Sequence, residues 1–119
     1  AESKNLPVPE FNFKDSLVIK SGEKEIICKY FGPAHTVDNI VMRIPVEKIL
    51  FGGCMVKSLS ANRPGNIRDA DLDSWPGTME KVITRFKNAR IVVPGHGSYG
   101  GTELLYHTLD LVKEYIANN

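Results

Sequence analysis

Short apolar runs and two segments of helical periodicity alternate along the chain, and their order restricts the fold. Runs typical of β-strands cover residues 15–20, 23–31, 38–44, 48–52 and 90–94. Segments with apolar residues at helical spacing lie between the last two runs and after the final one. Four strands followed by helix, strand and helix indicate an α/β layer with helices against one face of a sheet.

Each helical segment has a recognisable start and an apolar side. A short turn at 69–74 is expected before the first helix, which begins near Pro76 because proline fits only the first helical turn. Its apolar side is expected to consist of Trp75, Met79, Val82, Ile83 and Phe86. Thr102 is expected to cap the second helix. The buried side of that helix is expected to consist of Leu104, Leu105, Thr108, Leu111, Val112, Tyr115 and Ile116.

Size and composition point to one small domain and exclude several kinds of partner. The chain has 119 residues, 24% of them charged, with a net charge of +1 and no block of like charge. We therefore expect neither a nucleic-acid patch nor a polybasic membrane anchor. No apolar run approaches the length of a membrane span, and the N-terminus lacks the pattern of a signal peptide. Two helices cover one sheet face at most, so we expect the other to need a partner.

Three residues able to bind a metal each follow a predicted strand. His35 lies in the loop after the second strand, Cys54 directly follows Gly52-Gly53, and His96 lies in the glycine-rich loop after the last strand. Imidazole nitrogen and thiolate sulfur together suit zinc. Because the three lie far apart in the sequence, they are typical of a catalytic zinc site built on a sheet, in contrast to a zinc finger.

The same residues also permit a thiol hydrolase. In that alternative, His35 or His96 activates the Cys54 thiolate, and Asp38 or Asp69 orients the imidazole. The residues by themselves leave both interpretations open.

The remaining cysteine and histidine have simpler interpretations. Cys28 falls within a predicted strand and is expected to be a small buried side chain. His107 falls within the last helix and is expected to be a packed helix residue.

Five stretches together resemble the subclass B1 metallo-β-lactamases, the zinc carbapenemases of Bacteroides among them. They are GPAHTVDNIV (32–41), ILFGGCMVK (49–57), GNIRDAD (65–71), WPGTMEKV (75–82) and VVPGHGSYGGTELLYHT (92–108). The resemblance implies the C-terminal αβ half of an αββα sandwich, with a mixed sheet and helices on one face. It implies zinc-dependent hydrolysis of β-lactams, including carbapenems, in the periplasm or outside the cell.

The resemblance also implies roles for the three metal-binding residues. His35 is similar to the third histidine of a tri-histidine zinc site, and Cys54 and His96 are similar to two of the three ligands of a second zinc ion. The cofactor implied is therefore a pair of zinc ions.

Four further residues match positions around such a site. Lys57 is similar to the residue that binds the substrate carboxylate, and Asn66 to the asparagine that polarises the lactam carbonyl. Asp38 and Asp69 are candidates for hydrogen bonding that supports the zinc ligands.

One family motif is absent. Family members carry His-x-His-x-Asp, which supplies the other zinc ligands, and these 119 residues do not contain it. The chain is therefore expected to match the C-terminal half of a metallo-β-lactamase domain and to have little or no activity alone. The expected partner is the missing N-terminal half or a second copy of the chain. The alternative is a non-catalytic half-domain that serves as a folding, assembly or weak metal-binding unit.

Overall fold

The protein folds into one sheet flanked by two helices. The structure, a computed structural model, describes residues 16–22, 24–36, 38–65 and 67–118. Its helices are α1 (Trp75–Arg85), α2 (Glu103–Ala117) and the short 3₁₀ helix η1 (Pro45–Glu47). Its strands are β1 (Ser16–Ser21), β2 (Lys24–Lys29), β3 (Val41–Ile44), β4 (Ile49–Gly53) and β5 (Ile91–Pro94).

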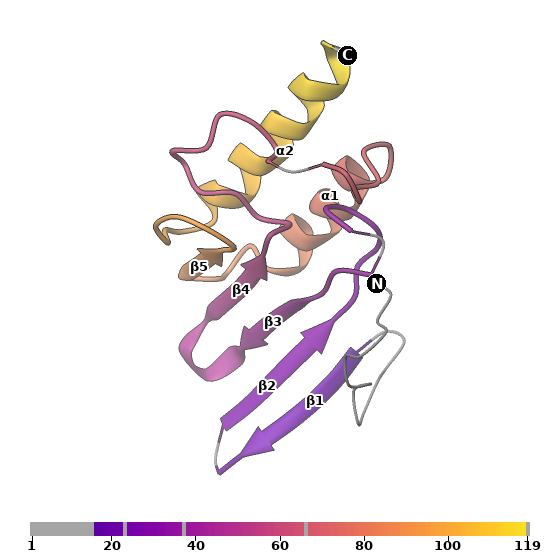
Figure 1. The fold of residues 1–119 in the computed structure, drawn as a ribbon. Helices are drawn as coiled ribbons and strands as arrows, with labels where there is room; N and C mark the ends of the chain where they lie inside the picture. Colours follow the sequence, from indigo (N-terminus) through magenta and orange to yellow (C-terminus); the bar gives the residue numbers. More distant parts are fainter. Residues whose placement is uncertain (1–15, 23, 37, 66, 119) are drawn as a thin grey trace, which may run out of the picture.

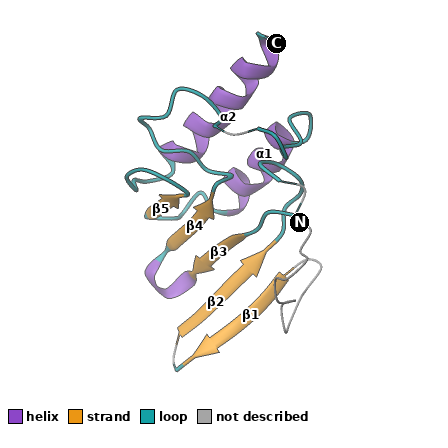
Figure 2. Ribbon diagram, viewed as in Figure 1, coloured by secondary structure: helices purple, strands orange, loops and turns teal. Residues whose placement is uncertain are grey.

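The strands lie in the sheet in their order along the chain, β1-β2-β3-β4-β5 (Figure 1). The first four are antiparallel neighbours, whereas β5 pairs parallel to β4. The parallel connection contains α1 and crosses back over the sheet. The two helices lie side by side near the β4–β5 end, and the β1–β2 hairpin extends away from them (Figure 2). The predicted α/β architecture, with a mixed sheet, is confirmed.

The core forms between the helices and one face of the sheet. Leu50 of β4 and Val92 of β5 are register partners, and both are fully buried. They belong to one apolar cluster with Met79 and Val82 of α1 and Leu105 of α2. Burial of these side chains is the main force that holds the helices to the sheet.

The opposite face of the sheet carries exposed apolar side chains that neither α1 nor α2 covers. Met42 and Phe51 are register partners on this face, and each is 36% exposed. Ile19 of β1 points to the same side and is 45% exposed. We call these three residues the bare sheet face. Cys28, opposite Met42 in the register, is 6% exposed, which confirms the expected small buried side chain.

Both helix starts differ in detail from a simple cap. The Asp71 carbonyl accepts a hydrogen bond from the Trp75 N–H at 3.0 Å, and its carboxylate accepts one from the Ser74 N–H at 3.1 Å. The predicted start of α1 is thus correct to one residue. Thr102 occupies the N-cap position of α2 as predicted, but its side chain forms no capping hydrogen bond. The Glu103 carboxylate accepts the Gly101 N–H instead, and backbone N–H donors hold the pKa of Glu103 below its ordinary value.

Two other expectations need correction. The predicted strand at 38–44 begins only at Val41, because Asn39 forms hydrogen bonds with the preceding loop. Between the predicted strands 38–44 and 48–52 the chain forms the helix η1, and Lys48 after it has a left-handed conformation with φ of 56°. Ile116 is 37% exposed at the end of α2 and lies outside the core.

Candidate functional site

The turn after β4 presents Cys54. Gly53 has φ of 63°, a left-handed conformation that favours glycine, and its carbonyl accepts a hydrogen bond from the Val56 N–H at 3.0 Å. At Gly52, an added Cβ would collide with the Val56 side chain. The two glycines therefore allow a sharp turn with Cys54 exposed.

The loop after β5 brings His96 to the same edge of the sheet. Since β5 is parallel to β4, their C-terminal ends are neighbours, with Gly53 opposite Pro94. A Cβ at Gly95 would lie 2.7 Å from the Cys54 Cα and 2.9 Å from its Sγ, so the loops touch closely. Cys54 and His96 line one pocket of about 290 Å³.

Lys57 and Arg63 give this pocket a positive charge, and both line it together with Cys54 and His96. The Lys57 Nζ lies 5.8 Å from the centre of the Trp75 ring, within range of a cation–π contact. Partial burial lowers the pKa of Lys57 below its ordinary value, and the charge of Cys54 opposes that shift. A cationic pocket of this kind suits a carboxylate or another small anion.

Trp75 connects Lys57 to His35. The half-buried His35 ring meets the Trp75 ring edge to face, with 5.7 Å between ring centres. The indole is fully buried, and its Nε1–H has no hydrogen-bond partner among the described residues. His35 does not line the Cys54 pocket, but both His35 and Lys57 rest against this one indole.

The loop that carries His35 is anchored to α1 and to the turn before it. The Thr78 hydroxyl donates a hydrogen bond to the Pro33 carbonyl at 2.8 Å. The Asp71 N–H donates to the Ala34 carbonyl, also at 2.8 Å. The position of His35 therefore depends on α1 as much as on the preceding strand.

The other predicted site residues have different positions. Asp38 is exposed, and its carboxylate accepts a hydrogen bond from the Thr36 hydroxyl at 3.1 Å. Asp69 is exposed in the turn before α1. Asn66 lies outside the described residues. His107 donates a hydrogen bond from Nε2 to the Ala61 carbonyl at 2.8 Å, which confirms the packed helix histidine.

The described residues do not by themselves form a closed metal site. No group of three or more His, Cys, Asp or Glu side chains in residues 16–22, 24–36, 38–65 and 67–118 lies close enough together to hold a metal ion. Structural zinc takes four protein ligands and catalytic zinc usually takes three. Cys54 and His96 share a pocket, so the described residues bring two potential zinc ligands together there, fewer than either kind of site takes.

Two supporting residues were missed as site residues, because apolar periodicity assigned both to the core. Trp75 is one. Thr108 is the other: its buried hydroxyl accepts a hydrogen bond from the Lys57 N–H at 2.7 Å and donates to the Leu104 carbonyl at 2.8 Å. The partners Lys57 and Thr108 lie far apart in the sequence, so no local pattern reveals the contact.

Thr108→Val is expected to lower the free energy of unfolding by about 1–3 kcal/mol, because it leaves the Lys57 N–H without its acceptor. Urea denaturation followed by the fluorescence of Trp75, the only tryptophan, measures the loss. Thr84→Val, at an exposed position of α1, is the control and should change stability by less than about 0.5 kcal/mol. Equal stability of both variants would show that the Thr108 hydroxyl does not hold Lys57.

Comparison with curated proteins identifies clear relatives, although no family model matches the chain. A protein named metallo-beta-lactamase type 2 from Bacteroides fragilis is 53% identical over 116 residues, which cover 98% of this chain and 47% of the relative. One of the same name from Bacillus cereus is 46% identical over 95 residues, or 80% of this chain and 37% of the relative. The chain thus spans about half or less of the length of these relatives.

The solved structures agree. A metallo-beta-lactamase from Pontibacter korlensis superposes with a TM-score of 0.87 at 41% identity, over 90% of this chain and 50% of that one. The described helices include none long and apolar enough to cross a membrane.

Proposed function

Since the chain belongs to the metallo-β-lactamase family, we propose that it is one half of an enzyme that hydrolyses β-lactams, carbapenems included, with two zinc ions. The observation that carries the proposal is the pocket in which Cys54, Lys57 and His96 meet. We also propose that the enzyme works in the periplasm or outside the cell.

Each residue contributes a separate part of the proposed site. Cys54 and His96 supply ligands for one zinc ion and His35 one ligand for the other. Lys57 holds the substrate carboxylate, a role supported by its place in a cationic pocket. Once ligands from outside this chain complete the two sites, bound zinc ions would supply Lewis acidity.

Supporting roles fall to three more residues. Asn66 polarises the lactam carbonyl, and Asp38 and Asp69 support the ligands through hydrogen bonds. For Asp38 and Asp69 this role requires rearrangement of exposed side chains when the other half is present.

The bare sheet face supports the need for a second half. Exposed apolar side chains gathered on one sheet face often mark an interface. We propose that the N-terminal half, which carries His-x-His-x-Asp in the family, packs on this face and completes the zinc sites. A second copy of this chain would cover the face but would not add that motif.

The purified 119-residue chain is expected to show no zinc-dependent turnover of nitrocefin, because it holds an incomplete ligand set. Refolding it with the N-terminal half of the Bacteroides fragilis relative should restore turnover. Cys54→Ser refolded with the same half is the control, and it should lose most of that activity through loss of a ligand.

Enzyme-like turnover by the chain alone would contradict the need for a second half. A zinc-binding but inactive mixture would favour the non-catalytic half-domain. Light scattering separates the two proposed partners: a homodimer of the chain alone would favour a second copy, and a 1:1 complex with the N-terminal half would favour that half.

A further inference from the structure

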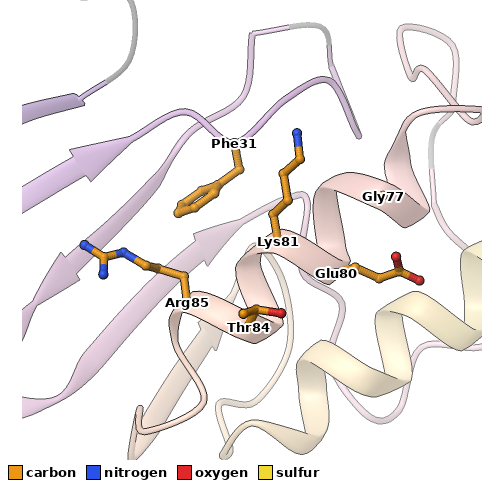
Figure 3. A pocket seen from close by; sticks show the side chains of 6 residues that line it. All are labelled: Phe31, Gly77, Glu80, Lys81, Thr84 and Arg85. Carbon is orange, nitrogen blue, oxygen red and sulfur yellow. The ribbon is translucent and has the colours of Figure 1, made fainter.

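A second groove lies outside the Cys54 pocket, between α1 and Phe31, which lies just after the end of β2. It has a volume of about 780 Å³, within the range of small-molecule sites, and shares no lining residue with that pocket. Its lining residues are Phe31, Gly77, Glu80, Lys81, Thr84 and Arg85 (Figure 3). We call it the basic groove.

Three positive side chains lie around Phe31: Lys81 and Arg85 line the groove, and Lys29 lies beside it. Lys81 and Arg85 are four residues apart on α1 and therefore share one helix face. Lys29 of β2 places its Nζ 5.5 Å from the centre of the Phe31 ring. Among the described residues, none of these three cations forms an ion pair with a carboxylate.

The one acidic lining residue does not neutralise them. The Glu80 carboxylate lies 3.8 Å from the Nζ of Lys113 on α2, and Figure 3 shows it directed away from Phe31. The groove and the neighbouring Lys29 thus place three positive charges without a carboxylate partner among the described residues around Phe31, an arrangement that attracts an anion.

Phe31 offers the groove a fixed aromatic surface. Its ring meets Phe86 edge to face, with 5.5 Å between centres and 80° between planes. Arg43 in turn lies over the Phe86 ring at 5.4 Å. A ring held in this way can stack on an aromatic ligand with little loss of side-chain freedom.

We propose that the basic groove binds a small aromatic phosphate monoester, such as a nucleoside monophosphate. The phosphate contacts Lys81, Arg85 and Lys29, and the aromatic ring packs against Phe31. A phosphate monoester carries about −1.5 to −2 charges near neutral pH and so matches three cations better than a carboxylate does. Arginine can also bind phosphate through two parallel hydrogen bonds.

Open space at the groove supports entry of such a ligand. A Cβ added at Gly77 would meet no atom within 4 Å. Thr84, a small side chain, also lines the groove.

Titration of the chain with AMP, followed by amide NMR shifts, tests the proposal without any β-lactam or zinc. AMP should shift the amide signals of 29–32 and 77–85 and bind more tightly than adenosine, inorganic phosphate or benzoate. Lys81→Glu and Arg85→Glu should each weaken AMP binding at least about tenfold, as expected for loss of a charge-assisted hydrogen bond. Both positions are exposed, so the variants should fold.

Lys87→Glu is the matched control, because Lys87 is an exposed cation just beyond α1 that does not line the groove. It should weaken AMP binding less than twofold. An equal loss in this variant, binding of inorganic phosphate as tight as that of AMP, or no saturable shifts would each overturn the proposal. None of these results depends on whether the refolded protein hydrolyses nitrocefin.

Discussion

A single methyl group added at position 95 is expected to disable the Cys54 site. In Gly95→Ala, the new Cβ would lie 2.7 Å from the Cα of Cys54 and 2.8 Å from its backbone nitrogen. Backbone atoms cannot rotate away as a flexible side chain can, so the turn after β4 must move. We expect the free energy of unfolding to fall by about 2–3 kcal/mol, as for other overpacked sites.

The effect on activity is expected to be larger than the effect on folding. Displacement of Cys54 misplaces a proposed metal ligand, and an error of about 1 Å can lower a rate by about a hundredfold. Urea denaturation of the variant and nitrocefin turnover after refolding with the N-terminal half measure the two losses.

Gly77→Ala is the control for this prediction. Gly77 lies in α1 with open space around its missing side chain, so alanine should stabilise the helix by about 0.5–1 kcal/mol. If Gly95→Ala were as stable and active as the unchanged chain, the close approach of the two loops would not matter.

Trp75→Ala is expected to cost about 3–5 kcal/mol, because it empties the volume of a fully buried aromatic side chain. That is a large part of the roughly 5–15 kcal/mol that stabilises a typical domain. The substitution also removes the surface on which His35 and Lys57 rest. Urea denaturation followed by circular dichroism measures the loss, since the only tryptophan is gone.

Trp75→Phe separates the contribution of apolar packing to stability from that of the indole N–H. Phenylalanine keeps much of the apolar volume and removes an N–H that lacks a partner among the described residues. Relief of that unsatisfied group offsets part of the lost packing, so the variant should be at least about 2 kcal/mol more stable than Trp75→Ala. Equal losses in the two variants would mean that the indole N–H has an acceptor beyond the described residues.

The sequence predicts the elements of the fold well because their signals are local. Alternating apolar runs identify all five strands, and Pro76 locates the start of α1 to one residue. The features that were predicted wrongly are set by side-chain hydrogen bonds, which are also local. Asn39 uses its side chain to hold a loop where a strand was expected, and at the start of α2 the Glu103 carboxylate accepts the Gly101 N–H while Thr102 forms no side-chain cap. Side-chain hydrogen bonds of this sort compete with regular structure, and apolar patterns do not report them.

The candidate site was predicted less completely, for a physical reason. Cys54 and His96 carry recognisable chemistry, and their place after strands predicts that they meet once β4 and β5 are neighbours. Trp75 and Thr108 carry no such signal. Their contacts with Lys57 depend on how α1 and α2 pack, which a single sequence does not reveal. Both residues support Lys57, and only the three-dimensional structure shows these contacts.

The parallel pairing of β4 and β5 also has a consequence for the order of folding. The β1–β2 hairpin joins residues close in sequence, so it can form early. Pairing of β4 with β5 must wait for the long crossover through α1 to close, and such non-local contacts form slowly. Cys54 and His96, the proposed zinc ligands, are therefore expected to come together late, after most of the sheet has formed.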